Sequence, residues 1–251
     1  DKAQKELQKI CTADIKNEPG KCIYTHMLNP DGGIETDLTV VCINKDYFRI
    51  ISSAATRERD KFHIKKYLSK DVELKDVTDD FCVFGVFGPK SRDLLKNLSK
   101  DNFENDQFRF GFAKFITIDG VKIWTQRLSY VGELGFELYV DLKDAKKIYE
   151  LLIEKGKDFN LSNCGMHAMD IMRMESGFLH WGHDISPEEN QYQAELSFTI
   201  STKKEFDFIG KQALEKIKQD KVKTRFSMFT LKESAPGKPL LLHDEPIYEG
   251  E

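Results

Sequence analysis

Hydrophobic residues recur along the chain with two different periods, which indicates a mixture of helices and strands. Spacings of three to four residues, bounded by helix-start and helix-stop residues, predict helices over 2–11, 53–68, 89–98, 141–156, 165–175 and 209–217. Alternating or continuously apolar runs predict strands over 22–27, 36–43, 47–52, 81–87, 121–128, 135–140 and 198–200. Ser53, Pro89 and Asp141 are expected to begin three of the helices. Gly156 and Gly177 are expected to end two of them.

The order of these elements favours an α+β fold. The strands over 22–52 follow one another through short turns, and the later strands and helices do not alternate strictly. We therefore expect antiparallel sheets with packed helices, in two intimate subdomains. Residues 218–223 are polar and linker-like, and a new β segment is expected near Arg225. Because the chain starts inside a predicted helix and stops after a strand-like segment, we interpret it as a piece of a longer polypeptide.

Composition narrows the class of protein. The 251 residues are 40% hydrophobic and 32% charged, which is enough to bury a sizeable core. The 38 basic and 42 acidic side chains give a net charge of −4, so nucleic acid is not an expected partner. No run of about 18 apolar residues is present, so no membrane span is expected. The five cysteines are scattered, and none has a Cys-x-x-Cys spacing, which favours a reducing, cytoplasmic location.

The first segment with candidate chemistry runs from Asp31 to Val40, where a double glycine leads into a strand. Period-2 alternation places Leu38 and Val40 on one face of this strand, and Asp37 and Thr39 on the other. If the second face lines a cavity, Asp37 is a buried carboxylate with a shifted pKa, which suits it to proton transfer. The alternative is an ordinary turn and strand whose polar face is solvated.

The second segment, residues 127–140, consists of two strand ends joined by a loop with two glycines and a tyrosine. Glu137 lies inside the otherwise apolar run Phe-Glu-Leu-Tyr-Val. A carboxylate in that setting accepts hydrogen bonds from a forked donor, such as an arginine or the amino and ring N–H edge of a pterin. Tyr130 offers a flat face and a hydroxyl. The alternative is a hairpin with Glu137 pointing to water.

The third segment, residues 165–184, carries methionines at helical spacing, which are more typical of a core than of a cofactor site. Asp170 and Arg173 are spaced to pair on a helix surface. His180, His183 and Asp184 form a weak metal pattern, and packed or hydrogen-bonded histidines are the favoured interpretation, so no metal is expected. The chain contains no Gly-x-Gly-x-x-Gly after a strand, no P-loop and no Gly-x-Ser-x-Gly.

Together, these three segments resemble the folate-binding aminomethyltransferase family. That family includes the glycine-cleavage T-protein and the C-terminal half of dimethylglycine and sarcosine dehydrogenases. The resemblance extends from about Lys9 to Glu251 and includes Phe-Gly-Pro-Lys at 87–90 and Phe-Ile-Gly-Lys-Gln-Ala-Leu at 208–214. It implies a folate-binding domain over residues 1–217, whose N-terminal strands are missing, and the truncated start of a C-terminal β-barrel over 224–251.

The resemblance also implies roles for individual residues. Asp37 matches the second Asp of the T-protein pattern Gly-Gly-Ile-Ile-Asp-Asp-Leu, and it is the implied catalytic residue. Tyr130 and Glu137 take folate-contacting places in the pattern Gly-Tyr-Thr-Gly-Glu-Asp-Gly-Phe-Glu-Leu, and Tyr24 and Thr39 match further contacts. Two positions depart from the T-protein pattern and match the dehydrogenase branch, namely Thr36 in place of the first Asp and Met169 in place of an arginine.

The implied function is one-carbon transfer to tetrahydrofolate, as the folate-binding part of a dimethylglycine or sarcosine dehydrogenase-like enzyme. The implied partners are a small N-methyl amine or aminomethyl donor and an upstream flavin domain, so FAD is expected only outside this chain. Two alternatives stay open. One is a free-standing aminomethyltransferase that acts on a lipoyl carrier protein. The other is a non-catalytic folate-binding or regulatory module.

Overall fold

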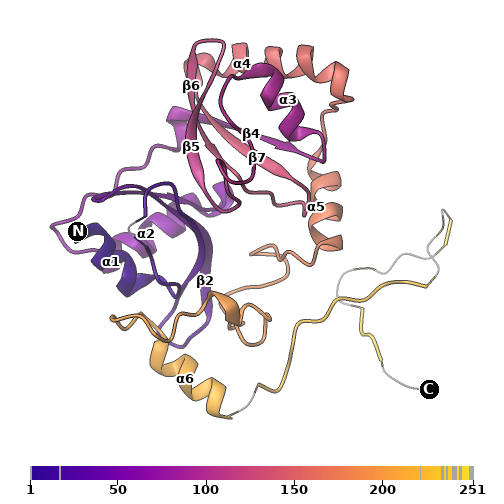
Figure 1. Cartoon of the computed structure of the whole chain (residues 1–251). Coiled ribbons are helices and arrows are strands. Elements are labelled where there is room, and N and C mark those ends of the chain that lie inside the picture. Colours follow the sequence, from indigo (N-terminus) through magenta and orange to yellow (C-terminus); the bar gives the residue numbers. More distant parts are fainter. Residues whose placement is uncertain are drawn as a thin grey trace.

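The computed structural model describes residues 2–248, apart from 17, 221, 233, 234, 236, 239–241, 243 and 244. The described residues form two antiparallel sheets with helices packed on their outer faces (Figure 1). The strands are β1 (Cys22–Leu28), β2 (Ile34–Asn44), β3 (Tyr47–Ile51), β4 (Phe81–Phe87), β5 (Ala113–Ile118), β6 (Val121–Gln126) and β7 (Gly135–Asp141). The α-helices are α1 (Lys2–Ile10), α2 (Arg57–Tyr67), α3 (Ser91–Leu98), α4 (Leu142–Gly156), α5 (Met166–Glu175) and α6 (Lys211–Asp220).

The first sheet has the strand order β1-β2-β3 and packs one face against α1 and α2. Alternation along β2 directs Leu38 and Val40 into this core, together with Leu7 and Ile10 of α1 and Ile64 of α2. Five fully or nearly fully buried aliphatic side chains of this kind supply most of the driving force for closing such a layer. The opposite face of β1 and β2 carries Tyr24, His26, Asp37 and Thr39, and is called the site face below.

The second sheet has the order β4-β7-β6-β5, and α3 and α4 cover one of its faces. Its core includes Leu95, Phe136, Leu138 and Ile148, all with no exposed surface. The other face turns toward the site face of the first sheet. Contacts between the two faces are made by a shared apolar cluster that contains Cys22, Val41, Ala113, Trp124 and Tyr139.

Backbone hydrogen bonds also join the two sheets. Cys22 N–H donates to the carbonyl of Gly111 at 2.9 Å, and Ala113 N–H donates to that of Gly20 at 2.7 Å. These bonds fix the start of β1 against the start of β5. The two subdomains are therefore held together by both main-chain pairing and apolar packing, and residues far apart in sequence meet on the facing surfaces.

The α+β class and the two subdomains are confirmed, and most predicted elements are present within a few residues. Three details are wrong. The strand β5 was missed, the helix expected at Pro89 begins at Ser91, and residues 197–199 form a 3-10 turn instead of a strand. The 3-10 turn is explained by its bonds: Thr199 N–H donates to Leu196 O, and its hydroxyl also donates there, so this backbone is satisfied locally.

The described residues of the range 222–248 form no helix or strand, so the expected β-barrel start is not confirmed. The barrel start was expected over residues 224–251. The other residues of that range lie outside the described part of the chain. Among the helices that the structure describes, none is long and apolar enough to cross a membrane.

Candidate functional site

A sharp turn positions the strand that carries Asp37. Gly32 has φ +88°, a conformation that favours glycine, and a Cβ at Gly33 would lie 1.8 Å from the carbonyl oxygen of Pro187. The Asn29 carboxamide oxygen accepts hydrogen bonds from the N–H groups of Asp31 and Gly33. The double glycine therefore serves the turn and its close approach to the 187 loop, and it sets the register that directs Asp37 to the site face.

The carboxylate of Asp37 is bonded to a tyrosine on the neighbouring strand. The Tyr24 hydroxyl donates a 3.1 Å hydrogen bond to Asp37 Oδ2. Burial raises the pKa of the Asp37 carboxyl, and the bond from Tyr24 opposes that rise. Burial around the Tyr24 hydroxyl and the charge of Asp37 raise the pKa of the phenol, although the ring as a whole is 38% exposed. Asp37 therefore combines a desolvated carboxyl with neutral hydrogen-bond donors, the Tyr24 hydroxyl and its own backbone N–H.

A buried histidine lies directly across from Asp37. His26 pairs with Asp37 in the β1–β2 register, and its own backbone N–H and C=O bond to Thr12 on the other side. The His26–Asp37 pair is thus of the non-hydrogen-bonded type, in which side chains lie closer together. The His26 ring contacts Tyr24 edge-on at 5.2 Å, and burial lowers its pKa to about 3. The His26 imidazole is therefore uncharged at neutral pH and forms one wall of the site.

Tyr130 approaches the same carboxylate from the loop before β7. Its hydroxyl donates to the carbonyl of Leu179 at 3.0 Å, and its ring lies nearly parallel to that of Phe178, with centroids 6.4 Å apart. Burial is the main cause that raises the pKa of Tyr130 to about 12, and the charge of Asp37 adds to it. The fold thus brings Tyr130 near Asp37 and Tyr24, whereas Thr39 lies beside Tyr24 in the β1–β2 register.

Glu137 lies on the inward face of the second sheet. Burial raises its pKa, and the Tyr139 hydroxyl donates to its Oε2 at 2.9 Å, which opposes the rise. No other hydrogen bond to this carboxylate is formed by the described residues. Its charge contributes, after burial, to raising the pKa of the Cys22 thiol to about 12, so Glu137 lies near the start of β1. Cys22 and Tyr24 lie on the same face of β1, so Glu137 and Asp37 both lie against this face of the first sheet.

The sequence analysis missed three further polar side chains between the two sheets, Gln126, Trp124 and Arg49. Gln126 is directly opposite Glu137 in the β6–β7 register, and Trp124 is opposite Tyr139. Gln126 Nε2 and Trp124 Nε1 are buried without a hydrogen-bond partner, as are Nε and Nη1 of Arg49. The signal in the sequence was period 2: Trp124 and Gln126 alternate with core residues in Val-Lys-Ile-Trp-Thr-Gln, so they share a face.

Residues 165–184, the third segment of the sequence analysis, are held in place by the ion pairs of Arg173. Arg173 is buried and forms ion pairs with Asp170, at 2.6 Å, and with Asp184. Asp184 Oδ2 also accepts from the His180 N–H, so this oxygen ties the 176–184 loop to Arg173. The His180 and His183 rings contact each other at 4.5 Å. No group of three His, Cys, Asp or Glu side chains able to hold a metal ion occurs in the described part of the chain.

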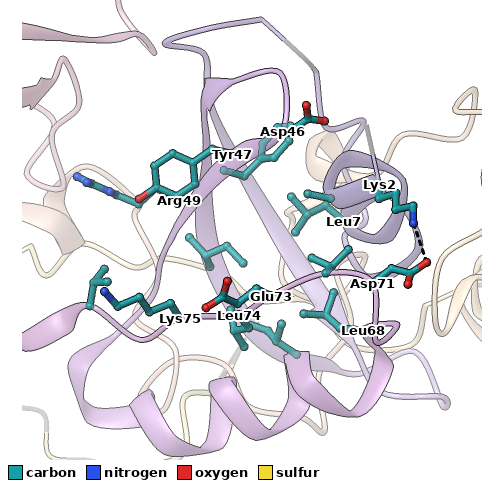
Figure 2. A pocket seen from close by; sticks show the side chains of 16 residues that line it. Lys2, Leu7, Asp46, Tyr47, Arg49, Leu68, Asp71, Glu73, Leu74 and Lys75 are labelled. Carbon is teal, nitrogen blue, oxygen red and sulfur yellow. Dashed lines mark hydrogen bonds and ion pairs between the residues drawn. The ribbon is translucent and has the colours of Figure 1, made fainter.

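A separate pocket of about 760 Å³ lies between α1, β3 and the loop after α2 (Figure 2). Figure 2 shows an apolar floor that includes Leu7, Leu68 and Leu74, and the ion pair of Lys2 with Asp71 at its rim. The Arg49 side chain extends away from this floor and stacks on the ring of Phe81 at 4.7 Å. The apolar floor of the pocket belongs to the core on the face of the first sheet opposite to Asp37 and Tyr24.

Comparison with known proteins agrees with this geometry. Residues 1–204 match the family described as the GCVT N-terminal domain. The chain is 36% identical, over 96% of its length, to 4-methylaminobutanoate oxidase (formaldehyde-forming) of Paenarthrobacter nicotinovorans. It is 34% identical, over 87% of its length, to the mitochondrial dimethylglycine dehydrogenase of Homo sapiens. It spans only 29% and 26% of these two relatives, respectively.

A solved structure shows the same fold. The glycine cleavage system aminomethyltransferase T from Bartonella henselae superposes with a TM-score of 0.75. The superposition covers 88% of this chain and 59% of that chain, at 22% sequence identity. The arrangement of two facing sheets described above is therefore the aminomethyltransferase fold.

Proposed function

Since the chain belongs to the GCVT N-terminal domain family and forms an aminomethyltransferase-like enzyme domain, we propose that it binds tetrahydrofolate and transfers a one-carbon unit to it. The observation that carries the proposal is the arrangement of Asp37 and Glu137. Two carboxyl groups with raised pKa values lie on facing sheets, and each accepts a hydrogen bond from a tyrosine hydroxyl, Tyr24 for Asp37 and Tyr139 for Glu137. Perturbed carboxyl groups of this kind gather at functional sites.

Asp37 is proposed as the catalytic residue. Its raised pKa places the carboxyl closer to neutral pH than an exposed aspartate, and a general acid or base is most effective near the operating pH. Tyr24 keeps the carboxylate in one orientation through the 3.1 Å bond to Oδ2. When bound, tetrahydrofolate would supply the N5 and N10 atoms that receive the carbon. Asp37 would hold or move a proton at that position.

Glu137 is proposed to hold the pterin edge. Its carboxylate has acceptor capacity that the Tyr139 hydroxyl does not use up, and it is desolvated, which strengthens any bond from ring N–H and amino groups. The residues present therefore fit a pterin. Tyr130 is proposed to form a wall of the site, with its ring fixed by the bond to Leu179, and Thr39 is proposed to contact the ligand from β2.

The donor is proposed to be a small N-methyl amine, oxidised by a flavin domain outside these residues. The similar proteins named an oxidase and a dehydrogenase support this proposal, as does the short share of each that this chain spans. Confining the oxidised carbon between the two sheets would exclude water and limit the release of formaldehyde. The alternatives stay open: a free-standing aminomethyltransferase, and a folate-binding module without catalysis.

The proposal is tested by measuring how the oxidised carbon divides between free formaldehyde and tetrahydrofolate. Full-length protein would be given an N-methyl amino acid with and without tetrahydrofolate, and free formaldehyde and folate-bound carbon would be measured. Transfer predicts that folate-bound carbon appears at the expense of formaldehyde. If tetrahydrofolate does not change the release of formaldehyde, the proposed transfer is refuted. The oxidised carbon then leaves the protein as formaldehyde without passing to folate. Transfer only from an aminomethylated carrier protein would favour the free-standing aminomethyltransferase.

A further inference from the structure

Two buried donors without partners, Gln126 and Trp124, lie on the same face of the second sheet as Glu137, and the proposed function does not use them. Gln126 has no exposed surface, and its Nε2 has no hydrogen-bond partner. The other end of the same carboxamide is fixed, because its Oε1 accepts from Cys22 Sγ at 3.9 Å. Native structures leave few such groups unpaired, and each one calls for an explanation such as a ligand.

Trp124, two residues before Gln126 on the same face of β6, is a second buried donor without a partner. Its Nε1 is buried and unpaired, and the residue is 6% exposed. Its ring is held by Phe115, at 4.9 Å edge-on, and by Arg49, whose guanidinium lies 6.0 Å from the ring centroid. The Arg49 guanidinium itself has two buried nitrogens without partners. One acceptor, Glu137, therefore shares its face of the second sheet with two N–H donors, Gln126 and Trp124, and Arg49 of β3 faces Trp124 from the first sheet.

An acceptor beside donors is complementary to a cyclic amide edge. In such an edge, ring N–H and amino groups stand next to a ring carbonyl. We propose that Gln126, assisted by Trp124, donates hydrogen bonds to the ring carbonyl of the ligand while Glu137 accepts from its N–H groups. The site then selects a 4-oxo pterin over a ring that carries a 4-amino group in the same place. This inference rests on the proposed folate function. It assigns recognition of the carbonyl oxygen at ring position 4 to Gln126 and Trp124.

The selection has a physical reason. A 4-amino group would place a donor against the donors of Gln126 and Trp124, and both sides would lose their bonds on burial. Sites built to hydrogen-bond one group reject an analogue that cannot return the bond, because buried polar groups are left unpaired. Gln126 Nε2 has no acceptor within the protein, so a 4-amino ligand would leave it without a hydrogen bond.

The test compares two ligands that differ at one position. Equilibrium binding of tetrahydrofolate and of tetrahydroaminopterin, its 4-amino analogue, would be measured anaerobically on the full-length protein. Wild type is expected to prefer the 4-oxo ligand by at least about tenfold, the equivalent of one buried hydrogen bond. Gln126→Met keeps side-chain length and removes the donor, so it should weaken tetrahydrofolate about tenfold and leave the 4-amino ligand unchanged or tighter.

Controls separate the possible failures. Gln107→Met, at an exposed glutamine on the 104–108 turn, should leave the ratio of the two affinities unchanged. If Gln126→Met does not fold, Trp124→Phe removes one N–H while keeping an aromatic ring, and it should shift the ratio in the same direction. An unchanged ratio in the folded variant would overturn this inference alone. A wild type that binds neither ligand would overturn the proposed function and this inference together.

Discussion

Tyr24 and Asp37 are diagonal neighbours on adjacent strands, and the Tyr24 hydroxyl donates a 3.1 Å hydrogen bond to Asp37 Oδ2. Diagonal pairs of an antiparallel sheet lie within reach of a long side chain such as tyrosine. The bond opposes the effect of burial, which alone would raise the pKa of Asp37 further. Tyr24 therefore orients the carboxylate and limits the rise in its pKa that burial causes.

Replacing Asp37 by asparagine should separate activity from stability. Asp37→Asn keeps the shape and a hydrogen-bond acceptor for Tyr24, but it cannot take up a proton, so one-carbon transfer should fall by about 10²–10⁴-fold. The pKa of Asp37 is raised in the fold, so its contribution to stability is complete below its unfolded value and is lost as pH rises through its folded pKa. The variant should therefore melt at a higher temperature than wild type at pH 7, as thermal unfolding would show.

The control for this prediction is Asp31→Asn, at an exposed position of the preceding turn. It should leave both the rate of transfer and the melting temperature unchanged. Transfer by Asp37→Asn within about twofold of wild type would remove Asp37 from the mechanism, since general acid–base catalysis contributes far more than that.

Removing the Tyr24 hydroxyl should shift the pH profile of transfer. The bond from Tyr24 lowers the pKa of Asp37, so Tyr24→Phe should raise it. If transfer needs the ionised carboxylate, the acid limb of the rate profile should move to higher pH, while the rate on the plateau changes less. The profile would be measured from about pH 5 to pH 9. Tyr149→Phe, at a half-exposed tyrosine of α4, is the matched control, and an identical acid limb in both variants would contradict the account.

The buried histidine should make the fold sensitive to acid. Burial lowers the pKa of His26 to about 3, whereas an unfolded histidine has a value of about 6.5. Its contribution to stability is present above about pH 6.5 and is lost as pH falls toward 3, by up to about 1.4 kcal/mol per pH unit. Urea unfolding at several pH values should therefore show a shallower acid dependence for His26→Asn than for wild type.

The exposed His167 provides the comparison, because His167→Asn should keep the wild-type dependence. An equal slope for His26→Asn and wild type would mean that other groups control acid unfolding. The result bears on the site, since His26 lies directly opposite Asp37 and is braced by Thr199, at 2.9 Å from its Nδ1.

The sequence predicted those parts of the fold that depend on local patterns. Period-2 alternation in β2 correctly placed Leu38 toward the core and Asp37 away from it. The strand β5 was missed because its alternation follows a polar, irregular stretch and becomes visible only through its pairing with β6. The helix α4 ends at Gly156 as predicted, and the 3-10 turn that follows over Lys157–Phe159 is stopped by the left-handed Asn160, with φ +58°.

The sequence motifs point to candidate site residues, but they do not show how those residues are arranged. Tyr24, Asp37 and Glu137 stand out through a motif, yet only the fold shows that Tyr24 bonds Asp37 and that Glu137 faces Cys22. Gln126 could not be recognised from composition, because a lone glutamine at the end of a strand is usually solvated. Its significance comes from register and burial, which are properties of the folded chain.

The most direct test of the central claim is an anaerobic calorimetric titration of the full-length protein with tetrahydrofolate, in wild type and in Glu137→Gln. The account predicts saturable binding to wild type and a loss of about 1–3 kcal/mol in the variant, because a charge-assisted acceptor is replaced by a neutral amide that presents a donor. Glu150→Gln, on the exposed side of α4, should bind as wild type does. Equal affinity of wild type and Glu137→Gln, or no binding by a folded wild type, would contradict the assignment of this site to folate.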